Sequence, residues 1–253
     1  MLKKRVIPLI LLSDDNIVKG KQFNNHISTG NPRSAVKVYV SQHCDEIMFI
    51  DIKATINSKK ALIKIIKETS VNCNVPFTVG GGIQDLNDIR ELLLSGADKV
   101  LITSQAAKDI KLIAEAANKF GNQCIVAGID YKSFDNKFEV YIKNATIKTE
   151  LDLFEYASLL EKNGAGEILL NSINNDGMMN GYDLKTIEKV SDLINVPLIA
   201  CGGAGTFKDI EDLFIKTNAS GAACASIFNF GDNNPFRLRS YLKNAGINVR
   251  KVK

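Results

Sequence analysis

Short apolar runs alternate with amphipathic segments along the whole chain. The apolar runs are almost continuous, which is typical of strands that are buried on both faces. They predict strands at residues 5–12, 46–51, 76–79, 99–102, 123–130, 167–171, 197–200 and 222–227. The segments between them show the helical period of 3.6 residues, most clearly just before Gly96, which acts as a stop signal. They predict helices at residues 33–42, 58–69, 85–94, 109–119, 150–162, 183–190, 207–215 and 234–244.

Eight strand–helix units within 253 residues predict one α/β domain, residues 1–253, folded as a (β/α)8 TIM barrel. An open, doubly wound sheet is the alternative. Two features favour the barrel: an internal repeat spaced at close to half the chain length, and a first unit without a G-x-G-x-x-G turn. The chain is therefore expected to consist of two similar half-barrels.

Two long loops interrupt this alternation, at residues 14–31 and 131–149. They follow the first and fifth strands, so both are expected at the C-terminal end of the barrel, where the active sites of such barrels lie. The first loop is rich in Asn, Gly and Lys, and we expect it to form a mobile flap.

The internal repeat places one glycine-rich turn in each half of the chain. Residues 76–89 read PFTVGGGIQDLNDI, and residues 197–210 read PLIACGGAGTFKDI. Each is followed by a small-residue strand with a hydroxyl near its end, SGADKVLITS at 95–104 and SGAACASI at 220–227. Glycine lets backbone N–H groups approach an anion, and the next helix directs its positive end at it. The repeat predicts two phosphate cradles and a ligand with two phosphates, although tight turns alone also explain the glycines.

The candidate site residues lie at the ends of the strands. Three carboxylates, Asp51, Asp130 and Asp176, end strands or follow them closely, where they face a barrel's site and can transfer protons. Asp130 is the strongest catalytic candidate because an ionisable group gains nothing structurally at the end of the run CIVAGID. Lys19 lies in the flap, within reach of an anion, or is an ordinary surface lysine. Phosphate contacts are expected from Gly81, Gly82, Thr103, Ser104, Gly177, Gly202, Gly203, Ala225 and Ser226.

The starts of four strands carry charges instead. These are Arg5, Glu46, Lys99 and Glu167, and the two glutamates are 121 residues apart, the same spacing as the two glycine-rich turns. Strand starts converge on the bottom of a barrel, where charges are usually stabilising or solvated. The spacing also allows the four side chains to form a ring of salt bridges around the barrel axis.

Composition narrows the classes of partner. Net charge is +4, but the lysines are dispersed, so we expect no nucleic-acid partner. The five cysteines form no CxxC pair and only two histidines are present, so neither a metal nor another cofactor is expected. No apolar run approaches the length of a membrane span or a signal peptide. We expect a cytoplasmic protein with reduced thiols.

Together these residues resemble the HisF family, the cyclase subunit of imidazole glycerol phosphate synthase. The most specific stretches are TVGGGI at 78–83, GADKV at 96–100, GAGEILL at 164–170, DGMMNGYD at 176–183 and CGGAG at 201–205. The resemblance implies a bisphosphorylated ribonucleotide bound at the top of the barrel. It also implies a HisH-like glutaminase partner docked at the bottom, whose ammonia enters through a gate formed by Arg5, Glu46, Lys99 and Glu167. Lys19, Asp51, Asp130 and Asp176 match active-site positions of the family.

One departure concerns the first strand, which in the family normally ends in a catalytic acid. Here that position is Leu11, which cannot exchange a proton, and Asp15 is four residues further along, roughly 13 Å away on an extended strand. Smaller departures are Thr103, Asn171 and Cys201, and the segment 143–148, which lacks the usual glycine. The gate is retained while one half of the acid/base pair is lost.

That combination resembles a branch of HisF-like proteins encoded in surface-polysaccharide gene clusters. The branch is associated with acetamidino sugars and implies that ammonia passes through the barrel to a separate sugar amidotransferase. The resemblance makes this the leading hypothesis. The alternatives are a working cyclase with Asp130 as its proton-transfer residue, a scaffold that only binds a phosphorylated ligand and a partner, and the one-chain isomerase related to this family, against which the charged ring counts.

Overall fold

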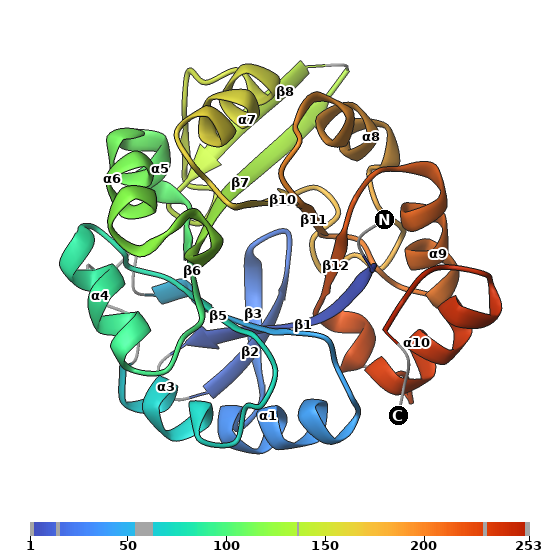
Figure 1. The fold of residues 1–253 in the computed structure, drawn as a ribbon. Helices are drawn as coiled ribbons and strands as arrows, with labels where there is room; N and C mark the ends of the chain where they lie inside the picture. Colours follow the sequence, from blue (N-terminus) through green and yellow to red (C-terminus); the bar gives the residue numbers. More distant parts are fainter. Residues whose placement is uncertain (1–2, 14–15, 54–62, 136, 230–231, 251–253) are drawn as a thin grey trace.

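Eight parallel strands close into a barrel surrounded by helices (Figure 1). The computed structural model describes residues 3–13, 16–53, 63–135, 137–229 and 232–250. The barrel strands follow the order β10-β11-β12-β1-β4-β5-β6-β7, and β7 pairs with β10 to close the ring, so the expected barrel is confirmed over an open sheet. Their bounds are β1 Arg5–Ser13, β4 Ile47–Asp51, β5 Phe77–Gly80, β6 Lys99–Ile102, β7 Ile125–Phe134, β10 Glu167–Ser172, β11 Leu198–Cys201 and β12 Gly221–Cys224.

The helices lie where the amphipathic segments predict them, with ends that local capping explains. Asp85 and Asp152 accept the first free N–H groups of their helices, and Thr206 forms a capping box with Asp209. The first part of the helix expected at 58–69 lies outside the described residues, and helices α5, η1 and η2 are additional to the expected ones. The bounds are α1 Pro32–Ser41, α3 Ile63–Ser70, α4 Leu86–Leu94, α5 Ser104–Lys108, α6 Lys111–Phe120, η1 Asn122–Cys124, α7 Leu153–Lys162, α8 Leu184–Leu193, α9 Phe207–Lys216, η2 Ser226–Phe228 and α10 Pro235–Asn244.

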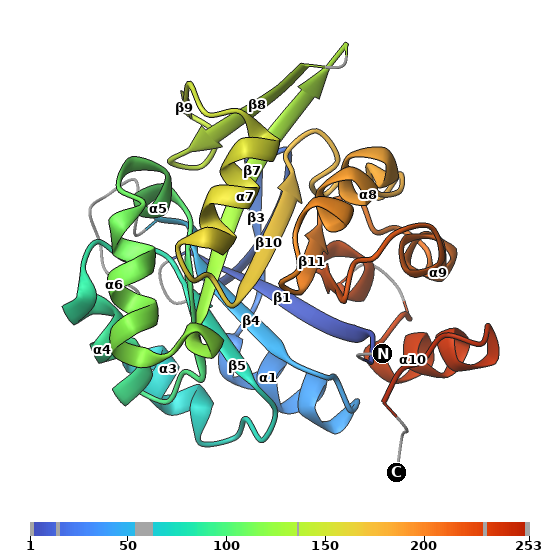
Figure 2. The same cartoon turned by 45° about the horizontal axis from the view of Figure 1, so that its top comes forward.

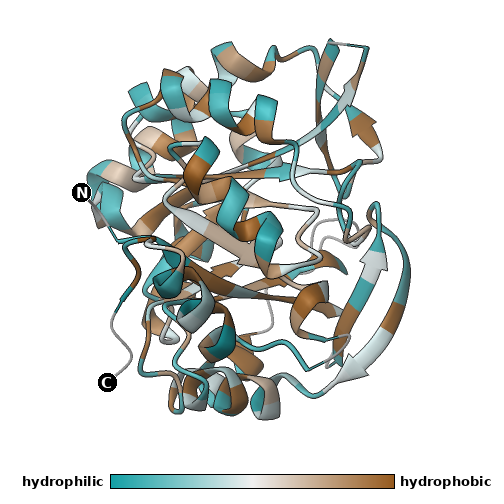
Figure 3. Cartoon of the chain, turned by 90° about the vertical axis from the view of Figure 1, so that its right-hand side faces the viewer, coloured by the Kyte–Doolittle hydropathy of each residue, from teal (hydrophilic) through white to brown (hydrophobic). Residues whose placement is uncertain are grey.

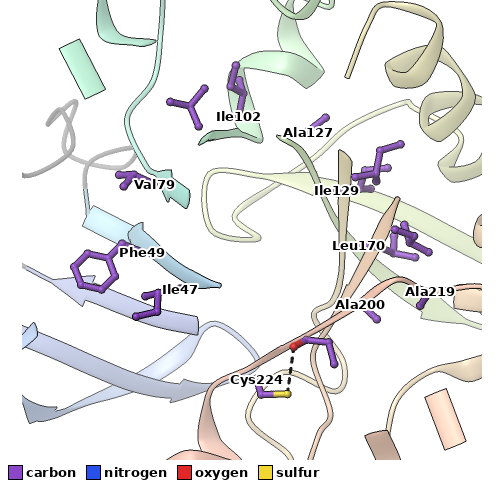
Figure 4. Packing of buried hydrophobic residues seen from close by; sticks show 14 of the residues in the cluster. Ile47, Phe49, Val79, Ile102, Ala127, Ile129, Leu170, Ala200, Ala219 and Cys224 are labelled. Carbon is purple, nitrogen blue, oxygen red and sulfur yellow. Dashed lines mark hydrogen bonds between the residues drawn. The ribbon is translucent and has the colours of Figure 1, made fainter. Parts of the chain in front are cut away.

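Alternation along the strands builds two separate apolar clusters. On β1, Val6 and Ile10 belong to the cluster between strands and helices, whereas Ile7 and Leu9 belong to the cluster inside the barrel. Figure 4 shows part of the outer cluster, including Phe49, Val79 and Ile102. The inner cluster comprises Ile7, Leu9, Met48, Leu101, Val126, Leu169, Ile199, Cys201 and Ala223. The barrel lumen is therefore apolar between its two ends.

The two long loops fold as strand hairpins, which corrects the expectation of irregular loops. β2 Asn16–Lys21 pairs antiparallel with β1 and with β3 Asn24–Gly30. β7 runs beyond the barrel to pair with β8 Lys137–Ile142, which pairs with β9 Ile147–Lys148, and this ribbon projects in Figure 2. Figure 3 shows both hairpins at the end of the molecule opposite the two termini. Within the described ranges, no helix has the length and hydrophobicity needed to span a bilayer.

Candidate active site and charged ring

A cavity of ≈ 320 Å³ opens at the C-terminal end of the barrel strands. It holds the three expected carboxylates, Asp51, Asp130 and Asp176, together with the first glycine turn. The floor of the cavity is apolar and is formed by Leu9, Leu11, Ile50, Leu101 and Leu169. The same residues belong to, or pack against, the cluster inside the barrel. The structure thus places three carboxylates directly above the apolar cluster inside the barrel.

The first glycine turn lines this cavity as the sequence predicts. Gly81 has φ +109°, and a Cβ there would overlap the backbone and side chain of Asp51. Gly82, Thr103 and Ser104 line the cavity beside it, and Ser104 Oγ accepts the N–H of Lys143. This turn leaves backbone groups close to the space that a ligand would occupy.

The second glycine turn occupies the corresponding position after β11 and β12, but its residues do not line this cavity. Gly203 has φ +116° and lies against the carbonyl of Gly181, so a Cβ there would overlap it. Ser226 is buried in η2 rather than ending a strand, which corrects the strand expected to reach residue 227. The remaining phosphate-site candidates are Gly202 and Ala225 in this unit and Gly177 after β10, and they are likewise absent from the lining. The structure does not bring the two turns into one open cavity.

Asp130 is partly exposed at the cavity, within the β7 strand. Burial raises its pKa to about 7, against a hydrogen bond from Asn171, and the nearby Asp176 adds to the rise. Asn171 Nδ2 donates to Asp130 Oδ1 at 3.1 Å, and Leu11 lies in the same cavity. A carboxyl group with a pKa near neutrality can both accept and return a proton at physiological pH.

The hairpin β2–β3 closes over one side of this site. The backbone N–H groups of Gln22 and Phe23 donate to the backbone and side chain of Asp176, at 2.8 Å and 3.3 Å. Burial raises the pKa of Asp176 to about 6, opposed by the Phe23 N–H and by Lys19. The hairpin therefore holds one of the site's acids in a defined position.

Lys19 is buried in this hairpin instead of reaching out from a loop. Its side chain is 3% exposed, and Nζ donates to the carbonyl of Leu9 at 3.0 Å. Burial lowers the pKa of Lys19 to about 8, partly offset by Asp176 and Cys201. Asp51, the remaining expected residue, accepts the N–H of Lys53 at 3.0 Å and lies at the cavity wall.

The four charges at the other end of the barrel meet in a ring. Arg5 donates to Glu46 at 2.9 Å and to Glu167 at 3.1 Å. Lys99 completes the ring with contacts of 3.0 Å to Glu46 and 2.9 Å to Glu167. Thr78 Oγ1 donates to the buried Glu46 at 2.7 Å. Two positive and two negative side chains thus neutralise each other across the base of the lumen.

Asn171 is a site residue that the sequence marked only as a departure from a family pattern. It pairs with Asp130 across β10 and β7, although the two lie 41 residues apart in the chain. Its contact depends on strand register, for which the sequence offers no local signal. The described residues contain no group of three or more His, Cys, Asp or Glu side chains placed to hold a metal ion.

We expect Gly177→Ala to loosen the hairpin over the site. Gly177 has φ +69°, and a Cβ there would overlap the carbonyl oxygen of Gly20 in β2. The hairpin must move away to relieve this overlap, so limited proteolysis should cut within residues 16–30 faster than in the wild type. Gly246→Ala is the matched control, since Gly246 has φ +80° but no neighbour within 4 Å of the added Cβ. Equal cleavage in the two variants would contradict the prediction.

We also expect Asp130→Asn to change how stability depends on pH. Because the pKa of Asp130 is raised in the folded state to about 7, the folded protein binds more protons than the unfolded chain above the unfolded pKa. Its contribution is present at low pH and is lost as pH rises through about 7, on the order of 4 kcal/mol. Urea unfolding across that range should show a shallower decline in the variant. Asp109→Asn, at an exposed position, should leave the wild-type slope, and equal slopes for both variants would contradict the assignment.

The fold and site define a class: (β/α)8 barrels with a carboxylate-lined cavity at one end of an apolar lumen and a charged ring at the other. Residues 5–234 match the family described as "Histidine biosynthesis protein". The chain is 42% identical over 250 residues to the "Imidazole glycerol phosphate synthase subunit HisF" of Natranaerobius thermophilus, covering 99% of this chain and 100% of that protein. Proteins of the same name from Flavobacterium psychrophilum and a Hydrogenobaculum species are 41% and 44% identical, with the same coverage. The chain belongs to the HisF family.

Proposed function

We propose that this chain is the ammonia-receiving barrel of a glutamine-dependent complex with a HisH-like glutaminase. The observation that carries the proposal is the alignment of three features on one axis: the ring of Arg5, Glu46, Lys99 and Glu167, the apolar lumen, and the cavity with Asp130. A neutral ammonia molecule crosses an apolar passage at much lower cost than an ammonium ion. The charged ring is the expected entrance on the glutaminase side.

The names of the relatives support cyclisation as the use of that ammonia. Full-length relatives at 41–44% identity are named subunits of imidazole glycerol phosphate synthase. On this reading the cavity binds a phosphoribulosyl-formimino ribonucleotide and converts it with ammonia to imidazole glycerol phosphate and an aminoimidazole carboxamide ribonucleotide, with release of one water molecule. Asp130 transfers the protons, Lys19, Asp51 and Asp176 hold the substrate, and the two glycine turns hold its phosphates. The second turn must then become accessible when the hairpin β2–β3 moves.

Leu11 favours a second candidate, in which ammonia passes onward to a sugar amidotransferase for a surface polysaccharide. Leu11 lines the cavity together with Asp130, where it offers no proton. Losing a general acid or base typically lowers a rate by about 10² to 10⁴. The ring and lumen need no such acid, so delivery of ammonia is unaffected by this residue.

The test uses the isolated barrel and a HisH-like glutaminase. The proposal expects the barrel to bind the glutaminase and to accelerate its release of ammonia from glutamine. Binding without acceleration would reduce the barrel to a scaffold and overturn the proposal. Turnover of the ribonucleotide in saturating ammonium, at mildly alkaline pH, then separates the two candidates: efficient turnover supports cyclisation, and its absence from an activating barrel supports onward transfer.

A further inference from the structure

We propose that Asn171 is a positioning residue of this site: its amide binds one oxygen of Asp130 and leaves the other to act on the ligand. Asn171 Nδ2 donates to Asp130 Oδ1 at 3.1 Å. Within the described residues, Asp130 Oδ2 takes no hydrogen bond, and both side chains line the cavity. Asp130 is thereby held at a fixed orientation by a single neighbour.

The backbone sets this pair in place. Asn171 and Asp130 are direct partners in the parallel pairing of β10 with β7, so their side chains emerge side by side on the inner face of the barrel. Gly202, with φ +87°, makes room for Asn171: a Cβ there would lie 3.0 Å from Asn171 Oδ1 and closer still to the carbonyl of Ser172. The contact is therefore specified by strand register and by a neighbouring glycine.

The amide's orientation points to a role beyond packing. When Asp130 is ionised its carboxylate only accepts hydrogen bonds, and the amide presents its Nδ2 side to it. This leaves Asn171 Oδ1 buried without a hydrogen-bond partner among the described residues, although buried acceptors are nearly always paired. An asparagine chosen only to fill space would not leave one polar atom unsatisfied. What asparagine contributes at this position is the hydrogen bond that its amide N–H donates to Asp130.

The remaining groups around Asp130 do not substitute for this donor. Asp176, after β10, is the titratable side chain that acts on Asp130, and Asp130 in turn raises the pKa of Cys201 on β11 and of Tyr156 on α7. Asp176 and burial both favour the protonated form of Asp130, whereas the Asn171 hydrogen bond favours the ionised form and lowers the pKa. Leu11 provides no further acid beside Asp130, and the Asn171 hydrogen bond tunes the protonation of the Asp130 carboxyl.

The test follows the side-chain carboxyl of Asp130 by NMR in protein labelled with ¹³C-aspartate, with Asp130→Asn to assign the signal. Asn171→Leu keeps the approximate shape and removes the donor, and it should move the titration midpoint upward from about 7 by about one pH unit. Leu169→Met lies on the same strand and lines the same cavity without touching the hydrogen bond, and should leave the midpoint in place. Asn171→Ala serves as a second variant if the leucine variant does not fold.

An unchanged or lowered midpoint in a folded Asn171 variant would overturn the proposal, as would an equal rise in Leu169→Met. The catalytic meaning of the pair rests on the proposed function, but this measurement needs neither substrate nor glutaminase. A barrel that fails to activate a glutaminase while showing the expected midpoints would refute the function and leave the role of Asn171 intact. The reverse result would refute the role of Asn171 alone.

Discussion

Replacing Leu11 by aspartate should raise the ammonium-dependent turnover of the phosphoribulosyl-formimino ribonucleotide by about 10² to 10⁴. Leu11 lies in the last part of β1 and shares the cavity with Asp130. A carboxylate at this position would give the site two proton-transfer groups, so that one can donate while the other accepts. The measurement is kcat/KM for the ribonucleotide in saturating ammonium, with wild type and variant compared at the same pH.

Leu11→Asn is the matched control for this experiment. It has nearly the same size and polarity as the aspartate variant but does not ionise, so it should remain at the wild-type rate. A gain of similar size in the asparagine variant would show that polarity, and not proton transfer, limits the reaction. Wild-type turnover within the usual enzyme range of about 1 to 10³ s⁻¹ would instead show that Asp130 suffices alone.

The sequence predicts the barrel and its charged ring because both depend on periodic features. Nearly continuous apolar runs define the parallel strands, and the strand starts then place Arg5, Glu46 and Lys99 at one end of the lumen. Strands that converge on a common axis bring such residues together whatever lies between them in sequence. For the same reason, Asp51 and Asp130 at strand ends were expected in one cavity, where the structure has them.

The covering segments could not be predicted in the same way. Residues 16–30 are mostly polar and exposed, so their composition indicates a loop, whereas they pair as β2 and β3 because β1 extends to Ser13 and offers an edge. Whether a glycine turn opens onto the cavity depends on what packs over it. Gly177 contacts Gly20, and Gly203 contacts Gly181. Each contact joins two separate segments of the chain, so no local sequence pattern predicts it.

Register explains the remaining gap between sequence and site. Asn171 was recognised only as an unusual residue, because its partnership with Asp130 requires β10 and β7 to be adjacent and aligned. β7 and β10 are consecutive strands of the barrel, so their adjacency follows from the fold, but a shift of one residue would turn Asn171 to the helix-facing side. The pairing of Glu167 with Val126 at the start of the same ladder fixes that alignment.

Replacing Glu46 by glutamine should lower the free energy of unfolding by about 3 kcal/mol, the lower end of the range for breaking a buried ion pair. Glu46 is 1% exposed and binds Arg5 at 2.9 Å, Lys99 at 3.0 Å and the Thr78 hydroxyl at 2.7 Å. Glutamine keeps the shape but leaves two cations facing Glu167 alone. The partial exposure of Arg5 and Lys99, at 21% and 14%, lets water offset some of the loss.

Urea unfolding of the isolated barrel measures this effect, with Glu139→Gln as the control. Glu139 also pairs with a lysine, Lys148, at 2.6 Å, but that pair lies on the exposed β8–β9 ribbon, where solvent screens it, and its loss should leave the unfolding midpoint unchanged. Equal stability of the Glu46 and Glu139 variants would show that the ring is not a closed, charge-balanced network. In that case the base of the lumen would hold four independently solvated charges, and a gate built from their mutual contacts could not operate.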